Sequence, residues 1–225
     1  MQNFLLSVSA SLFAGILLII IVSKTSDKAK WVLIGILGRL TNSDLDFVYE
    51  NKKASISEIE KEIKRANEIF IYASRGNELH RETFESIFMN KPKGRKVIIK
   101  ILLPDSLKKA DSNDWISQRE NELKKFDKSH GNGLFRSQIT SNIEFLKCYV
   151  ESNELELRLY DYPHTGRILI TDKFLYFTPY SKETHGRNNS VYKFKRGGEM
   201  YSNMKRYFFQ IWEKSRQMPL KELYE

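Results

Sequence analysis

Cysteine is almost absent from this chain of 225 residues, which contains only Cys148. A single cysteine excludes an intramolecular disulfide framework and a zinc site built from several cysteines. With 5 prolines and 11 glycines, the chain is neither collagen-like nor rich in linkers. Charged residues make up 29% and hydrophobic residues 41% of the sequence, which is the composition of a folded globular protein. The 37 Lys and Arg outnumber the 28 Asp and Glu, so the net charge is +9.

Charge is also absent from the first 23 residues. Their apolar stretch, Phe4–Val22, has about the length of a helix that crosses a bilayer core. A cleaved signal peptide would open with positive charge, which this segment lacks. The first lysines, beginning at Lys24, follow the apolar stretch and favour a cytoplasmic position for the rest of the chain. The sequence therefore predicts a single-pass transmembrane helix at residues 1–23, held in the lipid bilayer of the inner (cytoplasmic) membrane.

Small residues lie on one face of this predicted helix. Ser7, Ser11, Ala14 and Gly15 are spaced so that they share a face. They favour close helix–helix contact and a homo-oligomer, or they reflect only the tolerance of lipid-embedded helices for small residues. Residues 24–55 are expected to form a juxtamembrane segment and linker, with an interfacial stretch at Trp31–Gly38.

The following part of the chain alternates between helical and strand patterns. We expect a domain at residues 56–216 and a C-terminal tail at 217–225. Its first strand, helix and second strand form a β–α–β unit, whose strands run parallel. The fold class is therefore α/β, with a single mixed sheet flanked by helices. The expected helices are 56–67, 79–89, 114–126, 134–149 and 200–216, and the expected strands are 69–74, 97–103, 155–160, 168–171, 175–178 and 190–194.

Three features of this domain resemble one half of the phospholipase D-like fold. The first is the opening β–α–β unit, whose second strand ends in Leu-Leu-Pro at 102–104. The second is the segment Pro163–Asp172, followed by a strand and the turn Thr178–Ser181. The third is the closing helix Met200–Arg216. In the family that this resembles, the signature is His, one residue, Lys, four residues, Asp; its histidine attacks a phosphodiester phosphorus and its lysine holds the phosphate oxygens.

The match to this signature is imperfect at the histidine. With Asp172 on the aspartate, Arg167 occupies the lysine position and Thr165 the histidine position, while His164 lies one residue too early. Neighbouring strand residues point to opposite faces, so this shift turns the imidazole away. A bulge beside Gly166 would bring His164 back and make His164 and Asp172 the catalytic residues. Without it, the fold keeps an arginine that grips phosphate but lacks a nucleophile.

Polar residues at the strand ends and turns are the candidates for a phosphate-binding pocket, because α/β folds bind ligands there. Other interpretations remain open: Asn77 as the N-cap of a helix, His185–Arg187 as a surface turn, and the basic run Lys193–Gly198 as a solvated strand end or a track for a phosphate backbone. The four histidines lack the helical spacing of a metal site, so we expect neither metal nor cofactor. The candidate ligand-binding residues are Arg75, Asn77, Arg81, Arg167, Tyr180, His185 and Arg187.

The whole design resembles bacterial anti-phage effectors, in which a transmembrane segment is fused to a ligand-sensing domain. That resemblance implies a non-catalytic domain that binds a nucleotide or oligonucleotide and controls assembly or opening of a transmembrane helix bundle that acts as an ion channel. It also implies a nucleotide-synthesising partner enzyme. Two alternatives stay open: a membrane-anchored phosphodiesterase or nuclease, which would need a dimer because such sites use two signatures, and a scaffold held at anionic lipid by its charge.

Overall fold

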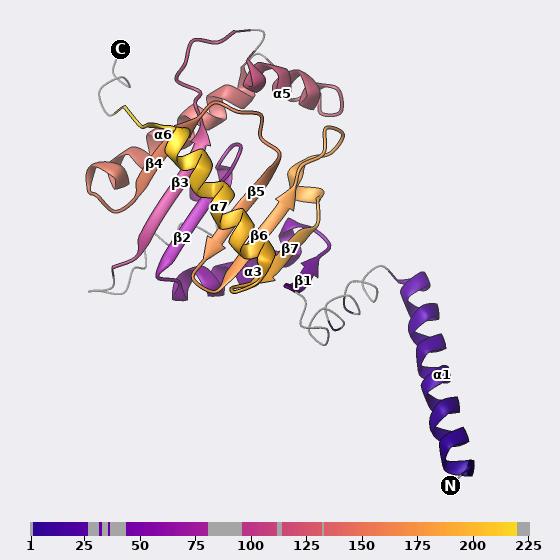
Figure 1. Ribbon diagram of the computed structural model, residues 1–225. Helices are drawn as coiled ribbons and strands as arrows, with labels where there is room; N and C mark the ends of the chain where they lie inside the picture. The colour runs from indigo at the N-terminus through magenta and orange to yellow at the C-terminus, as the bar shows by residue number, and fades with distance from the viewer. Residues whose placement is uncertain are drawn as a thin grey trace.

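The computed structural model describes residues 2–26, 32, 36, 44–80, 96–111, 114–131 and 133–219. Within them, the chain builds one sheet of eight strands in the order β1-β7-β6-β5-β2-β3-β4-β8 (Figure 1). The strands are β1 Leu45–Tyr49, β2 Glu68–Tyr72, β3 Ile98–Pro104, β4 Glu156–Tyr160, β5 Gly166–Thr171, β6 Phe174–Pro179, β7 Val191–Lys195 and β8 Arg216–Gln217. The helices are α1 Gln2–Thr25, α3 Lys52–Arg65, α5 Trp115–Lys124, α6 Leu134–Glu151 and α7 Glu199–Lys214, with the 3-10 turns η1 Asn77–His80 and η2 Gly186–Asn188.

The sheet is mixed, as the sequence predicted. Strands β2, β3 and β4 run parallel to one another, whereas the pairs β2–β5, β5–β6, β6–β7 and β1–β7 are antiparallel. The parallel strands are buried, and the apolar runs of β2 and β3 match this position. The prediction of a single mixed sheet flanked by helices is therefore confirmed.

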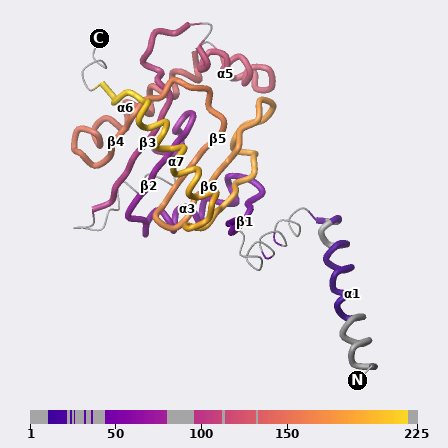
Figure 2. The backbone as a smooth tube through the Cα atoms, viewed as in Figure 1, coloured from indigo at the N-terminus to yellow at the C-terminus, as the bar shows by residue number. Residues whose placement is uncertain are grey.

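Helices cover both faces of the sheet. Helix α7 crosses one face diagonally and contacts β4, β5, β6 and β7 (Figures 1 and 2). On this face the ring of Phe70 stacks on Phe208, with 5.5 Å between centroids, and Lys100 lies 4.7 Å from the ring centroid of Trp212. Helices α3 and α6 lie behind the sheet in Figure 1. Because alternate residues of a strand face opposite sides of the sheet, each inner strand contributes side chains to the core on both sides.

Local sequence explains where α3 begins and what it buries. The Asn51 side chain accepts a hydrogen bond of 3.1 Å from the Ala54 backbone N–H and so caps the helix. Ile59 and Ile63, one turn apart, are both buried. The helix thus starts four residues before the predicted residue 56, because the cap lies in a polar stretch without apolar periodicity.

The structure corrects the assignment of residues 24–55 to a linker. Residues 45–49 form strand β1, which pairs with β7 and buries Val48 and Tyr49. The acidic residues Asp44 and Asp46 interrupt the apolar pattern, so a search for apolar runs does not detect this strand. In the structure, Asp46 forms an ion pair of 3.0 Å with the buried Lys193. At the other end of the domain, the predicted final helix stops at Lys214, and β8 then pairs with β4.

The N-terminal segment forms the predicted helix, α1. In the described part of the chain, no helix combines the length and apolarity that crossing a membrane requires. Most of the segment 31–38 lies outside the described residues, as do most of the predicted helix 79–89, the candidate Arg81 and the tail from residue 220. Of the predicted helix 79–89, the structure describes only the end of η1.

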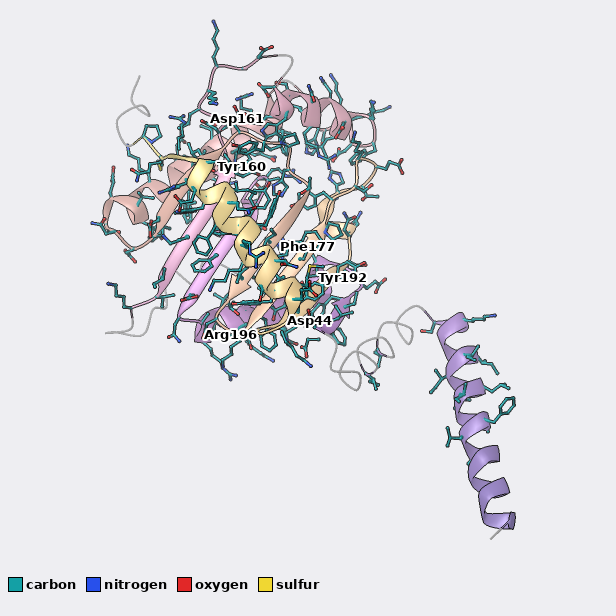
Figure 3. The ribbon with its side chains drawn as sticks, viewed as in Figure 1. Asp44, Tyr160, Asp161, Phe177, Tyr192 and Arg196 are labelled. Carbon is teal, nitrogen blue, oxygen red and sulfur yellow. The ribbon has the colours of Figure 1, made fainter. Side chains whose placement is uncertain are left out.

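The two ends of the sheet differ in what they carry. Tyr160 and Asp161 lie at one end, where the parallel strands reach their carboxyl termini, and Asp44 and Arg196 lie at the other end (Figure 3). The carboxyl end of parallel strands is where ligands bind in α/β folds. The site described next lies at that end.

Candidate anion-binding site

A cavity of about 250 Å³ opens at the carboxyl end of β2. Its walls come from the turn after β2, the first residues of β5, the last residues of β6 and the loop that contains η2. Helices α3, α5 and α6 close its remaining sides. The lining residues are Lys52, Ala73, Ser74, Arg75, Gly76, Asn77, Glu78, Arg119, Leu123, Phe135, Arg167, Thr178, Tyr180, His185, Gly186 and Arg187.

The cavity brings together six of the seven residues that the sequence singled out as ligand-binding candidates; Arg81 lies outside the described residues. Sequence reasoning missed Lys52, Glu78 and Arg119, which also line it. Lys52 lies in a polar stretch far from the signature, and Arg119 belongs to a helix of alternating charges. Nothing in the spacing of Lys52 or Arg119 marks either as a partner of the strand ends. Glu78 directly follows the candidate Asn77, so its place in the same turn could have identified it.

Arg167 is the most deeply placed cation of the cavity. Its side chain is 4% exposed, and its Nη1 donates a hydrogen bond of 3.0 Å to Oε1 of Glu78. Its Nε and Nη2 are buried and have no hydrogen-bond partner in the described chain. Thr178, directly opposite on β6, also has a buried hydroxyl without a partner among the described residues. Such orphaned donors indicate a bound water or ion at this place.

Glu78 holds two cations at the wall of the cavity. In addition to its contact with Arg167, Glu78 forms an ion pair with Lys52, with 3.1 Å between Oε2 and Nζ. Burial opposes ionisation of this carboxyl, but Lys52 and Arg167 outweigh burial and hold the pKa of Glu78 well below its usual value. Glu78 is therefore a carboxylate at neutral pH, and its charge keeps the two cations in place.

The turn after β2 is fixed by helix α6. The Asn142 side-chain amide donates two hydrogen bonds, one of 2.6 Å to the Arg75 carbonyl oxygen and one of 2.9 Å to Oδ1 of Asn77. The Nη1 of Arg75 donates a hydrogen bond of 3.2 Å to Oε1 of Gln138. The same nitrogen lies 3.2 Å from Nε2 of His130. Asn77 is the first residue of η1, so the N-cap position falls on Gly76 and not on Asn77 as predicted. The Oδ1 of Asn77 accepts from Asn142, so the residue helps to hold the turn against α6.

The loop after β6 covers the mouth of the cavity. Nε2 of His185 lies 3.0 Å from Oδ2 of Asp127, which ties the loop to the end of α5. Burial, and then the neighbouring Arg187, lower the pKa of His185. Arg187 is exposed, and Tyr180 lies at the base of the loop. A side chain at Gly186 would place its Cβ 2.4 Å from the Tyr180 ring, so only glycine allows this close approach.

His164 lies outside this cavity, among aromatic rings. Its centroid is 4.4 Å from Tyr72 and 4.9 Å from Tyr180, and its Nδ1 is 2.6 Å from the Tyr160 hydroxyl. Burial, and then the positive charge of Arg119, lower the pKa of His164 to about 3. The imidazole is therefore neutral at pH 7.

The strand register explains why His164 and Arg167 separate. Ile168 pairs with Tyr72 on the face that carries α7, and His164 contacts that same Tyr72. Arg167 points to the opposite face, towards Glu78. The β5–β6 pairing is continuous from Gly166 to Ile170, with no bulge that would shift the register.

Asp172 lies at the far end of β5. It accepts hydrogen bonds from the backbone N–H of Asn67, at 3.0 Å, and from the Asn67 amide, at 3.4 Å. Arg196, which Figure 3 places at the end of the sheet away from Tyr160, donates 3.1 Å to the Asp172 carbonyl. Asp172 follows the last residue of β5 and lies five positions after Arg167, or roughly 16 Å along an extended chain. Asp172 thus ties β5 to the start of β2 and does not line the cavity.

The basic run at 193–198 has a structural role. Lys193 is buried and forms ion pairs with Asp46 and Glu58. Its ammonium group also lies 3.7 Å from the ring centroid of Phe174. These contacts leave Lys193 unavailable to a nucleic-acid backbone.

Electrostatics decide what the cavity can bind. Five cations and one carboxylate line it, a net charge of +4 with His185 neutral. A cleft lined by one sign of charge focuses the field and attracts the opposite charge. Among the described residues, no group of three or more His, Cys, Asp or Glu is arranged to hold a metal ion. The arrangement therefore suits an anion, and a guanidinium suits phosphate.

No protein-family model and no curated protein matches this chain. Among solved structures it is similar to TrmBL2, an archaeal chromatin protein described with a novel mode of DNA binding; identity is 19%, the TM-score is 0.46, and 96% of this chain and 67% of that chain are covered. It is also similar to Nuc from Salmonella typhimurium, a phospholipase D family member, at 11% identity and a TM-score of 0.45, covering 76% of this chain and 95% of that one. NucT from Helicobacter pylori gives 13% identity and a TM-score of 0.40, covering 74% and 92%. At this level the similarity concerns the fold alone.

Proposed function

We propose that this protein binds the phosphate group of a nucleotide or short nucleic acid in the cavity around Arg167, without cleaving it. The observation that carries the proposal is the Arg167 side chain, which is 4% exposed and has two nitrogens without a partner in the described chain. A buried donor without a partner costs about 1–3 kcal/mol, and more when it is charged. Two oxygens of one phosphate would satisfy both nitrogens in the bidentate manner that suits a guanidinium.

The surrounding charges support the same ligand. Arg75, Arg119 and Arg187 line the cavity together with Arg167. The Thr178 hydroxyl can donate to the same oxygens, because it faces Arg167 across the β5–β6 pair. Positive charge in a half-enclosed cleft attracts phosphates from a distance and holds them by short contacts.

We propose that the protein does not cleave its ligand, because of where the His164 imidazole lies. A nucleophile must reach the phosphorus that the cations hold. His164 does not line the cavity, and the Tyr160 hydroxyl holds its Nδ1 at 2.6 Å. The alternative is a phosphodiesterase that acts as a dimer, and it requires His164 to reach a phosphate held by Arg167.

Binding is tested with the full chain, purified in detergent micelles. The probe is a short single-stranded DNA with a 5′ phosphate and a 3′ fluorophore, followed by fluorescence anisotropy over a series of salt concentrations. We expect saturable binding that weakens with salt and that pyrophosphate displaces. Arg187→Ala should weaken binding and lower the slope of log K against log salt by about 1.

The matched control is Arg206→Ala, which removes the same charge from an exposed position on α7. This variant should bind the probe as the unmodified chain does. Equal losses in both variants, or no binding at all, would contradict the proposal. Cleavage of the probe that disappears in His164→Ala would instead support the phosphodiesterase.

We also propose that α1 attaches the chain to a lipid bilayer. Its described side chains include Leu12, Phe13 and Leu18, which are 62%, 67% and 63% exposed. Nothing in the described chain covers these apolar groups, and lipid would. Full-length chain should sediment with membranes and resist alkaline extraction, whereas a chain lacking residues 1–25 should not. Release of the full chain by alkali would contradict attachment through α1.

The remaining part of the proposal joins the two sites. Ligand bound at the cavity would change the assembly of α1 helices in the membrane, through a difference in affinity between two assembled states. Cross-linking of the full chain in vesicles, with and without the DNA probe, tests this coupling. A role in anti-phage defence rests on the resemblance in design, and survival of phage-infected bacteria that express the chain tests it.

A further inference from the structure

A second cavity, of about 390 Å³, adjoins the first. Ser74, Arg119 and Tyr180 line both. We propose that this second cavity binds the base of the same nucleotide whose phosphate lies beside Arg167, an inference that rests on the proposed function. Its other lining residues are Trp115, Gln118, Glu122, Pro163, His164, Thr165, Ser181 and Lys182.

The shared residues place the two cavities side by side. Arg119 lies between them and is held in place, because it donates 2.9 Å to Oε2 of Glu122 and 3.1 Å to the Ser181 carbonyl. A ligand that joins an anionic group to a flat ring through one sugar would pass Arg119 and Tyr180.

The walls of the second cavity suit a planar ring. Trp115, Gln118, Arg119 and Glu122 lie on one face of α5. The rings of His164 and Tyr180, which lie 4.9 Å apart, also line this cavity. Aromatic side chains and guanidinium planes are the surfaces on which proteins stack unpaired bases.

Hydrogen bonding fixes the tautomer of His164. The Tyr160 hydroxyl has one proton, and it donates this proton to the Ala73 carbonyl at 3.0 Å. With that proton on the Ala73 carbonyl, the 2.6 Å contact is assigned as a donation from Nδ1–H of His164 to the hydroxyl oxygen. A neutral imidazole with its proton on Nδ1 leaves Nε2 as an acceptor, and Nε2 is buried without a partner in the described chain.

Trp115 supplies the complementary group. Its Nε1–H is also buried and has no partner among the described residues. One acceptor and one donor thus belong to lining residues of the same cavity, and the edge of a base also carries donors beside acceptors. A sugar phosphate has no such planar edge. These two groups therefore favour a nucleobase over an apolar ring.

The experiment compares adenosine monophosphate with ribose 5-phosphate as competitors of the fluorescent DNA on the full chain. Both carry the phosphate and the sugar, and only the former carries a base. We expect adenosine monophosphate to compete roughly tenfold better, as stacking of one base predicts. Gln118→Trp should remove this advantage by filling the cavity, while competition by ribose 5-phosphate stays unchanged.

Gln210→Trp is the matched control, since it adds the same side chain at an exposed position on α7; it should keep the tenfold advantage. A second variant, Trp115→Phe, should reduce the advantage without changing competition by ribose 5-phosphate. If both competitors act equally on the unmodified chain, the base site is wrong and the phosphate site stands. If neither competes, both proposals fail. An advantage that survives Gln118→Trp would place the base elsewhere.

Discussion

Arg167 and His164 are three residues apart, yet their side chains point to opposite faces of the sheet and line two different, adjoining cavities. Arg167 donates a hydrogen bond of 3.0 Å to Glu78 on the face covered by α3 and α6. The His164 ring lies on the α7 face, with 4.4 Å between its centroid and that of the Tyr72 ring. The odd spacing alone produces this, because strand residues alternate between faces. In a strand with the family signature, the corresponding His and Lys would point the same way.

Replacing Glu78 should have opposite effects on stability and on ligand binding. Glu78→Gln leaves Lys52 and Arg167 without their carboxylate, so we expect the free energy of unfolding to fall by about 3 kcal/mol. The cavity meanwhile gains one unit of positive charge, so binding of the DNA probe should tighten. Chemical denaturation and anisotropy measure the two effects. As a control, Glu156→Gln removes an exposed partner of Lys100 and should change stability by less than about 1 kcal/mol.

His164 should make the protein less stable in acid. Its pKa is about 3 in the folded chain and near 6.5 when unfolded, so below pH 6.5 the unfolded chain binds the extra proton. The free energy of unfolding is therefore unaffected by the titration of His164 above pH 6.5. It falls as the pH drops from 6.5 towards 3, by up to about 1.4 kcal/mol per pH unit. His164→Gln should show a shallower decline than the unmodified chain over this window. Parallel curves from denaturation at several pH values would contradict the assignment of His164.

Asp172 should matter for stability and not for binding. Asp172→Ala removes the acceptor of two hydrogen bonds from Asn67, one of them from its backbone N–H. We expect a loss of about 1–2 kcal/mol in the free energy of unfolding. Affinity for the DNA probe should stay the same, because the residue lies at the other end of β5. Lys173→Ala is the neighbouring control, and weakened probe binding in Asp172→Ala alone would be the contrary result.

Gly166 should tolerate no side chain. A Cβ there would lie 2.7 Å from Cε2 of Phe177 and 2.9 Å from the Thr178 carbonyl oxygen, which belongs to the paired strand. Gly166→Ala should therefore cost about 1–3 kcal/mol of stability, as other overpacked substitutions do. Thermal unfolding should show a lower midpoint for Gly166→Ala and an unchanged one for Thr165→Ala, whose side chain is exposed. A stable Gly166→Ala chain would mean that β5 and β6 separate more easily than their register suggests.

The sequence by itself determined the alternation of helices and strands in the domain, because apolar periodicity reports which face of each element is buried. The runs 69–74 and 97–103 predicted the strands β2 and β3. It also pointed to six residues of the cavity, since strand ends and their turns meet at one edge of a sheet. The one-residue shift of His164 could likewise be read from spacing alone.

The tertiary structure alone decided which distant residues complete the site. Lys52 and Arg119 reach the cavity from α3 and α5, and no local pattern links either to β5. Strand β1 is a similar case, because its acidic Asp46 is stable in the sheet only when it pairs with Lys193, far along the chain. Pairing between charges depends on distance in space and not on separation in sequence, so only the folded chain reveals it.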